Sequence, residues 1–144
     1  MTNKTRSVVT LAATTALMVT ATLLLHGAVP HGLPLGTYKT VISAQEVPPS
    51  FPPEIAGTWE IEYLEGRNFI VWKDGEFVVS GSFVSNPARL IVHDQEGPLA
   101  CVDPGTKTGV YQWTQQGNDL ILTGIQDRCF GRAFVLTAHP LERQ

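Results

Sequence analysis

Few residues of this chain have types and spacings that suit catalysis. Glu60 and Glu62 lie two positions apart, so on a β-strand they would share one face, as an acid and base pair would. They belong to residues 57–63, GTWEIEY, in which an aromatic or aliphatic residue stands at every second position. This alternation is typical of a strand with one face in a core and one in water. The two glutamates are therefore predicted to form a solvated face.

His93 is a second isolated candidate. It alternates with Arg89 and Ile91, so on a strand it could face inward, toward a polar ligand or a haem iron. A lone histidine on a strand is more often a surface residue. The chain also lacks a Ser-His-Asp order, a nucleophile elbow, an HExxH motif, a phosphate loop and a Rossmann fingerprint. We therefore expect no enzyme, no cofactor and no metal site.

The two cysteines, Cys101 and Cys129, form no CxxC motif and have no third ligand cluster, which argues against zinc. They are either a disulfide or two buried thiols, and the compartment decides between these. The chain is mildly acidic, with 10 Lys and Arg against 13 Asp and Glu. It has no basic run beside its aromatic residues. Such a surface repels phosphate backbones, so we expect no nucleic-acid partner.

Residues 1–28 have the pattern of an export segment. Lys4 and Arg6 precede an uncharged stretch from Ser7 to Leu25. This stretch is near the ~20 residues that span a bilayer, and longer than the apolar core of about 7–15 residues of most cleaved signals. It is predicted to be an apolar helix that serves either as an uncleaved membrane anchor or as a cleaved signal. Either way the rest of the chain is translocated. We then expect a Cys101–Cys129 disulfide, because exported proteins fold in an oxidising compartment.

Residues 29–53 are predicted to be a proline-rich linker. Their prolines disfavour a helix and favour extended backbone: Pro30, Pro34, Pro48, Pro49, Pro52 and Pro53. A segment of this composition acts as a semi-rigid spacer. We therefore expect residues 54–144 to form the folded domain.

Residues 54–144 are predicted to be all β. Turn signals recur every ~8–12 residues, which is typical of a sandwich or a barrel, and Asp74-Gly75 is the strongest hairpin signal. We expect Phe77, Val79, Gly81 and Phe83 to share one strand face, and residues 132–138 to be the last strand. With seven or eight short strands joined by hairpins, the expected fold is an up-and-down antiparallel barrel, since closure removes exposed edges.

The Gly57-x-Trp59 motif on the first predicted strand resembles that of the lipocalins and their calycin relatives. The layout of Gly-Thr-Trp, Lys-Asp-Gly, Gly-Pro-Leu-Ala-Cys, Gly-x-Tyr-x-Trp and Asp-x-Cys-x-Gly-Arg resembles small exported bacterial lipocalin-like proteins. The resemblance covers most of residues 54–139 and implies a fold rather than a function. It implies that Trp59 is a structural plug at the closed end, with Arg132 packed over it in a cation–π contact. The Thr-Asp-Tyr motif of true lipocalins is absent, and no helix is predicted after the last strand.

The candidate ligand-binding residues are five aromatic side chains of the predicted strands: Tyr63, Phe69, Phe83, Tyr111 and Trp113. In small barrels such side chains also simply fill the interior. Two functions therefore stay open. The first is an extracytoplasmic lipocalin-like domain that binds a small hydrophobic or amphipathic ligand at the end opposite Trp59. The alternative is a filled barrel that acts as an envelope-associated interaction or inhibitor domain. An apolar cavity of ~300 Å³ or more would favour binding.

Overall fold

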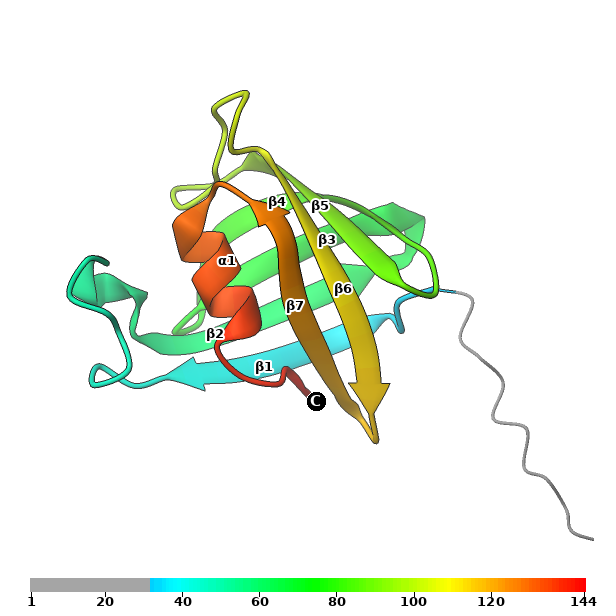
Figure 1. The fold of residues 1–144 in the computed structure, drawn as a ribbon, viewed down its shortest axis with the longest axis horizontal. Helices are drawn as coiled ribbons and strands as arrows, with labels where there is room; N and C mark the ends of the chain where they lie inside the picture. Colours follow the sequence, from blue (N-terminus) through cyan, green and yellow to red (C-terminus); the bar gives the residue numbers. More distant parts are fainter. Residues whose placement is uncertain (1–31) are drawn as a thin grey trace, which may run out of the picture.

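The computed structural model describes residues 32–144, which form an eight-stranded antiparallel meander bent into a nearly closed barrel (Figure 1). The strands are β1 Gly36–Ile42, β2 Gly57–Leu64, β3 Asn68–Lys73, β4 Glu76–Ser85, β5 Arg89–Glu96, β6 Thr108–Gln116, β7 Asp119–Asp127 and β8 Glu142–Arg143. Two 3₁₀ turns, Pro53–Ile55 and Glu65–Arg67, and one helix, α1 Phe130–Thr137, complete it. Their order in the sheet is β7-β6-β5-β4-β3-β2-β1-β8. The predicted all-β meander is confirmed.

The alternation in residues 57–63 has the predicted consequence. Trp59, Ile61 and Tyr63 are buried on the inner face of β2, while the glutamates between them are partly exposed. Gly57 is required at the start of this strand because its φ is +139°. A Cβ at this position would also lie only 2.6 Å from a carboxylate oxygen of Asp74. That carboxylate accepts the N–H of Thr58 at 2.8 Å, so the β3–β4 turn holds the entry of β2.

A β-bulge lies between β3 and β4. Val71 pairs with Val79, but Trp72 pairs with Phe77, which leaves Val78 as the extra residue. Val78 and Val79 are both buried, whereas Phe77 turns outward, with its ring centroid 6.1 Å from that of Trp72. The prediction that Phe77 shares the face of Val79 is therefore wrong, because the bulge shifts the alternation by one residue.

The structure corrects the predicted linker over residues 29–53. Residues 36–42 of this stretch form β1, which pairs with β2 along its full length, from Gly36–Tyr63 to Ile42–Gly57. Tyr38, Thr40 and Ile42 of β1 face the interior and are buried. The barrel therefore requires residues upstream of 54. The prolines flank the strand and do not interrupt it, because none of them falls within residues 36–42.

The predicted last strand, residues 132–138, is also wrong. Residues 132–137 belong to α1, whose Val135 and Leu136 are buried. The three successive apolar residues Phe134, Val135 and Leu136 do not alternate, so they fit a helix face as well as a strand. The two-residue β8 lies beside β1 instead. Leu141, which directly precedes β8, exchanges two backbone hydrogen bonds with Leu120 of β7, so this end of the chain connects β1 to β7.

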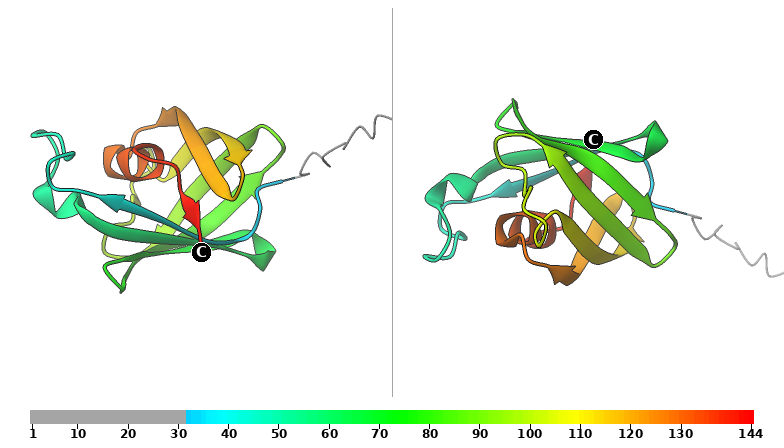
Figure 2. Two further views of the ribbon diagram at one scale, coloured as in Figure 1. Left: turned by 90° about the horizontal axis from the view of Figure 1, so that it is seen from below. Right: turned by 90° about the horizontal axis from the view of Figure 1, so that it is seen from above.

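The two ends of the barrel differ. At one end, Leu33 N–H donates to Ser85 Oγ and Trp113 Nε1–H donates to Asn86 O, and the side chains of Leu33 and Trp113 are buried. The described chain begins at this closed end, while α1 and the loop of residues 43–56 lie toward the other side (Figure 2). Within residues 32–144, no helix is long and apolar enough to cross a membrane. The predicted anchor or signal, residues 1–28, lies outside the described residues.

Candidate functional site

A cavity of about 900 Å³ enters the barrel from the end that carries α1. Its inner wall is almost entirely apolar and comes from β2, β3, β4 and β5: Trp59, Ile61, Tyr63, Phe69, Val71, Val79 and Val92. Tyr63 stacks edge-on against Phe83 at 5.1 Å, and Phe83 is not part of the lining. The cavity therefore ends near Tyr63.

Gly81 makes room for the aromatic wall of the cavity. A Cβ at Gly81 would lie 2.7 Å from ring atoms of Phe69 and 2.2 Å from the carbonyl oxygen of His93. No real Cβ makes contacts this close, so a side chain here would displace the ring or separate β4 from β5. Gly81 therefore lets Phe69 lie flat against β4 while it lines the cavity.

Three segments surround the mouth of the cavity: residues 43–56, residues 97–107 and residues 128–136. Phe51 of the first segment contacts Phe134 of α1, with ring centroids 5.1 Å apart. Three large apolar side chains of the rim are exposed to water: Leu99 and Val102 are each 50% exposed and Phe130 is 73% exposed. The mouth is therefore an apolar opening.

The Cys101–Cys129 disulfide joins two sides of this mouth. It connects the β5–β6 loop to the residue that precedes α1, and both cysteines line the cavity. The expected disulfide is confirmed. Asp94 has a carboxylate oxygen within 4.8 Å of both sulfur atoms. The disulfide removes both thiolates as metal ligands, so this group does not form a metal centre.

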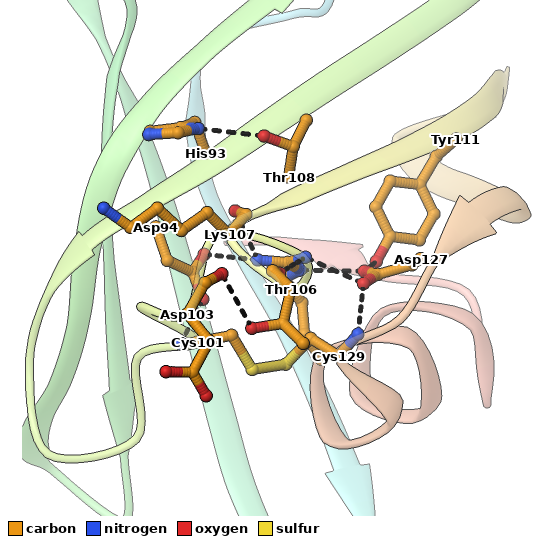
Figure 3. A network of polar contacts seen from close by, with 11 residues as sticks. His93, Asp94, Cys101, Asp103, Thr106, Lys107, Thr108, Tyr111, Asp127 and Cys129 are labelled. Atoms are coloured by element: carbon orange, nitrogen blue, oxygen red, sulfur yellow. Dashed lines mark hydrogen bonds and ion pairs between the residues drawn. A yellow bond between two sulfur atoms is a disulfide. The ribbon is translucent and has the colours of Figure 1, made fainter.

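A buried ionic network lies beside the disulfide (Figure 3). Arg132 is at its centre, because it pairs with both Asp94 and Asp127. Its Nε and Nη2 donate to Asp127 at 2.8 and 2.7 Å, and Nη1 lies 2.9 Å from Asp94 Oδ1. The carbonyl oxygens of Thr106 and Lys107 accept two more N–H groups. The arginine side chain is 9% exposed and each carboxylate is 2% exposed. The network thus fixes α1 to β5, β7 and the 97–107 loop.

The network also shifts proton affinities. Burial by itself lowers the pKa of Arg132, but its hydrogen bonds to Asp127 and the negative charges of Asp94 and Asp127 outweigh it and raise that pKa above its ordinary value. Burial raises the pKa of Tyr111, and the hydrogen bond that its hydroxyl donates to Asp127 raises it further. Arg132 therefore stays charged and Tyr111 stays neutral.

The structure places two of the five predicted ligand-binding residues in the cavity wall and three outside it. Tyr63 and Phe69 line the cavity. Phe83, Tyr111 and Trp113 are buried but are not part of the lining, because they belong to the packed part of the barrel. The expected mouth, at the end opposite Trp59, is filled by side chains, and the cavity opens at the Trp59 end instead.

The predicted plug of Trp59 and Arg132 is also corrected. Both residues line the cavity, but Arg132 is held by two carboxylates, and the cation–π contact found for Trp59 does not involve it. The cation near the Trp59 ring is Lys73, with its Nζ 5.8 Å from the ring centroid. Trp59 Nε1–H donates to Ile55 O at 2.9 Å, which ties the 43–56 loop to β2.

His93 does not face the interior. Leu90, Val92 and Asp94 are the buried residues of β5, and His93 lies on the opposite face, with Nδ1 2.9 Å from Thr108 Oγ1. Asp94 and Asp127 were not among the predicted site residues. A usable signal for Asp94 was its position two residues after Val92 and four after Leu90, which places its carboxylate on the apolar face of the strand.

Comparison of this chain with protein-family models, curated proteins and solved structures found no match. The nearly closed barrel is compatible with the lipocalin-like fold that the Gly57-x-Trp59 motif resembles. Function is therefore inferred from the cavity, its mouth and the charged groups in its wall.

Proposed function

We propose that this protein is an extracytoplasmic binding protein that holds a small hydrophobic or amphipathic molecule inside its barrel. The cavity of about 900 Å³, with its apolar inner wall, is the observation that carries this proposal. Pockets for small molecules typically measure ~300–1,000 Å³, and combine apolar walls with a few fixed polar groups. Asp94, Thr106 and Arg132 are such groups here.

The exposed rim supports entry of the ligand through the mouth. Leu99, Val102 and Phe130 keep apolar surface in water, which costs free energy unless something covers it part of the time. The same three residues line the cavity, so the apolar surface is continuous from the rim to the interior. The disulfide supports an extracytoplasmic location, because disulfides persist in oxidising compartments.

The alternative, a filled barrel that acts through its outer surface, requires an interior closed by its own side chains. The cavity argues against this alternative. We also propose binding without catalysis, since the charged groups of Arg132 and Asp127 are engaged with each other.

Binding of a neutral naphthylamine dye, measured by its fluorescence, tests the proposal. The dye is expected to bind the wild-type chain and to lose most of its affinity for Ala100→Phe, because Ala100 lines the mouth and a phenyl ring would obstruct it. Ala88→Phe is the matched control, since Ala88 is exposed in the β4–β5 turn outside the lining. If the dye fails to bind, or binds both variants equally, the cavity is not the binding site. If the dye binds as expected, native mass spectrometry of protein purified from the envelope identifies the class of the natural ligand.

A further inference from the structure

Asp94 has unused acceptor capacity at the cavity wall. Its Oδ2 accepts the N–H of Cys101 at 2.9 Å, and its Oδ1 lies 2.9 Å from Arg132 Nη1. That second contact is an ion pair without hydrogen-bond alignment, so within residues 32–144 Oδ1 accepts no hydrogen bond. An ionised carboxylate offers about four acceptor positions. Asp94 is thus a buried carboxylate that faces the cavity with positions left to fill.

Most donors of the same network are already used. Arg132 donates four hydrogen bonds from Nε, Nη1 and Nη2, and its remaining N–H belongs to the nitrogen paired with Asp94. Asp127 accepts two bonds from Arg132, one from the N–H of Cys129 and one from the hydroxyl of Tyr111. A ligand can therefore find an acceptor at Asp94, whereas Arg132 has one N–H left, on the Nη1 atom beside Asp94.

The charges in the cavity wall and at its rim also disfavour an anionic ligand. Asp94 and Asp127 carry two negative charges against one on Arg132, which leaves the buried network with a net charge of −1. At the rim, Glu54 and Asp103 line the cavity against a single exposed base, Arg128. Asp94 N–H donates to the carbonyl oxygen of Lys107 at 3.0 Å, but the Lys107 side chain forms no ion pair within the described part of the chain. An anionic head group would meet like charge in a poorly solvated place.

We propose that the cavity selects amphiphiles that carry a protonated amine, with the ammonium group against Asp94 and the apolar part against Trp59 and Phe69. This inference rests on the proposed function, namely that the cavity binds an amphipathic molecule. An ammonium group supplies N–H donors for the unfilled positions of Asp94 and balances the net charge of the network. A carboxylate head group does neither.

Displacement of the naphthylamine dye from the full chain by three molecules of equal chain length tests this proposal. Decylammonium, decanol and decanoate contain ten carbon atoms each, so their affinities differ chiefly through the head group. At neutral pH, decylammonium is expected to bind about tenfold more tightly than decanol, and decanoate more weakly than decanol. Added salt should reduce these differences, because it screens charges near the mouth.

Two variants test whether Asp94 causes the differences in affinity between the three head groups. Asp94→Asn should bring the three affinities together, whereas Glu65→Gln, which removes an exposed carboxylate outside the lining, should preserve their order. Circular dichroism first establishes that Asp94→Asn is folded; if it is not, the order in the wild-type chain decides. Equal affinities or a preference for decanoate would overturn the charge selection, yet leave the binding function intact. Failure of the dye itself to bind would overturn both. An unchanged order in folded Asp94→Asn would remove Asp94 from the proposal.

Discussion

Arg132 and Asp127 form a two-pronged ion pair in which Nε donates to Oδ2 at 2.8 Å and Nη2 donates to Oδ1 at 2.7 Å. Paired bonds between a guanidinium and a carboxylate fix orientation as well as distance. This pair joins the end of β7 to the first turn of α1, and Asp94 extends it to β5. The helix that forms one side of the cavity mouth is therefore held by charge as well as by apolar packing.

Replacement of Arg132 should destabilise the fold strongly. Arg132→Met is expected to lower the free energy of unfolding by ~3–5 kcal/mol, because it leaves two buried carboxylates without their counter-ion. Urea unfolding followed by circular dichroism measures the change. Arg128→Met is the matched control, since Arg128 is exposed and should change stability by less than ~0.5 kcal/mol. Equal effects of the two substitutions would show that the network does not hold α1.

Loss of the disulfide should weaken both the fold and the mouth. The double variant Cys101→Ser/Cys129→Ser has no cross-link that restricts its unfolded chain. The chain-entropy estimate therefore predicts that its free energy of unfolding falls by ~3–4 kcal/mol. Hydrogen exchange should speed up most in residues 97–107 and in α1, which the bond connects. Thiol labelling of unfolded, unreduced wild-type protein should detect no free cysteine. Labelling at both positions would contradict the bond.

The barrel should need β1 in order to fold. A fragment of residues 32–144 is expected to give a β-rich circular dichroism spectrum and a cooperative unfolding transition. A fragment of residues 54–144 should not, because it lacks β1 and exposes the edge of β2 that β1 covers. It also loses the buried side chains of Leu33, Tyr38 and Ile42. A cooperative transition in the shorter fragment would make β1 dispensable.

The three tyrosines of the chain, Tyr38, Tyr63 and Tyr111, should titrate late. Burial raises the pKa of each above its ordinary value of 10.0. The unfolded chain therefore loses protons near pH 10 before the folded chain does, so stability is complete below this pH and falls as the pH rises above it. Tyrosinate absorbance should appear together with the loss of the circular dichroism signal. Tyrosinate formation at its ordinary pH in the folded protein would contradict this prediction.

Trp59 should report ligand binding. It is the one tryptophan of residues 32–144 that lines the cavity, whereas Trp72 lies on the outer face and Trp113 in the closed end. Decylammonium is therefore expected to change the intrinsic fluorescence of the wild-type chain and of Trp72→Phe. In Trp59→Phe that change should disappear. A change that survives in folded Trp59→Phe would place the bound molecule away from the inner wall.

The sequence by itself determined which residues of β2 face the core and that β3 and β4 are neighbours. Alternation in GTWEIEY identified the buried side chains of β2, and Asp74-Gly75 identified the β3–β4 turn. Both signals act over a few residues, through side-chain direction and turn geometry. The predicted export of the chain and its two cysteines likewise led to the disulfide, because disulfides persist in oxidising compartments.

Only the tertiary structure decided where the barrel opens. A strand within the proline-rich stretch closes the sheet beside β2, and residues 130–137 form a helix where a strand was expected. The cavity follows from these two placements together with the network of Asp94, Asp127 and Arg132, whose members are far apart in the chain. Contacts of this kind are chosen by how volumes and charges balance over the whole interior. For this reason the Gly57-x-Trp59 strand proved to lie beside the mouth, and not at the closed end.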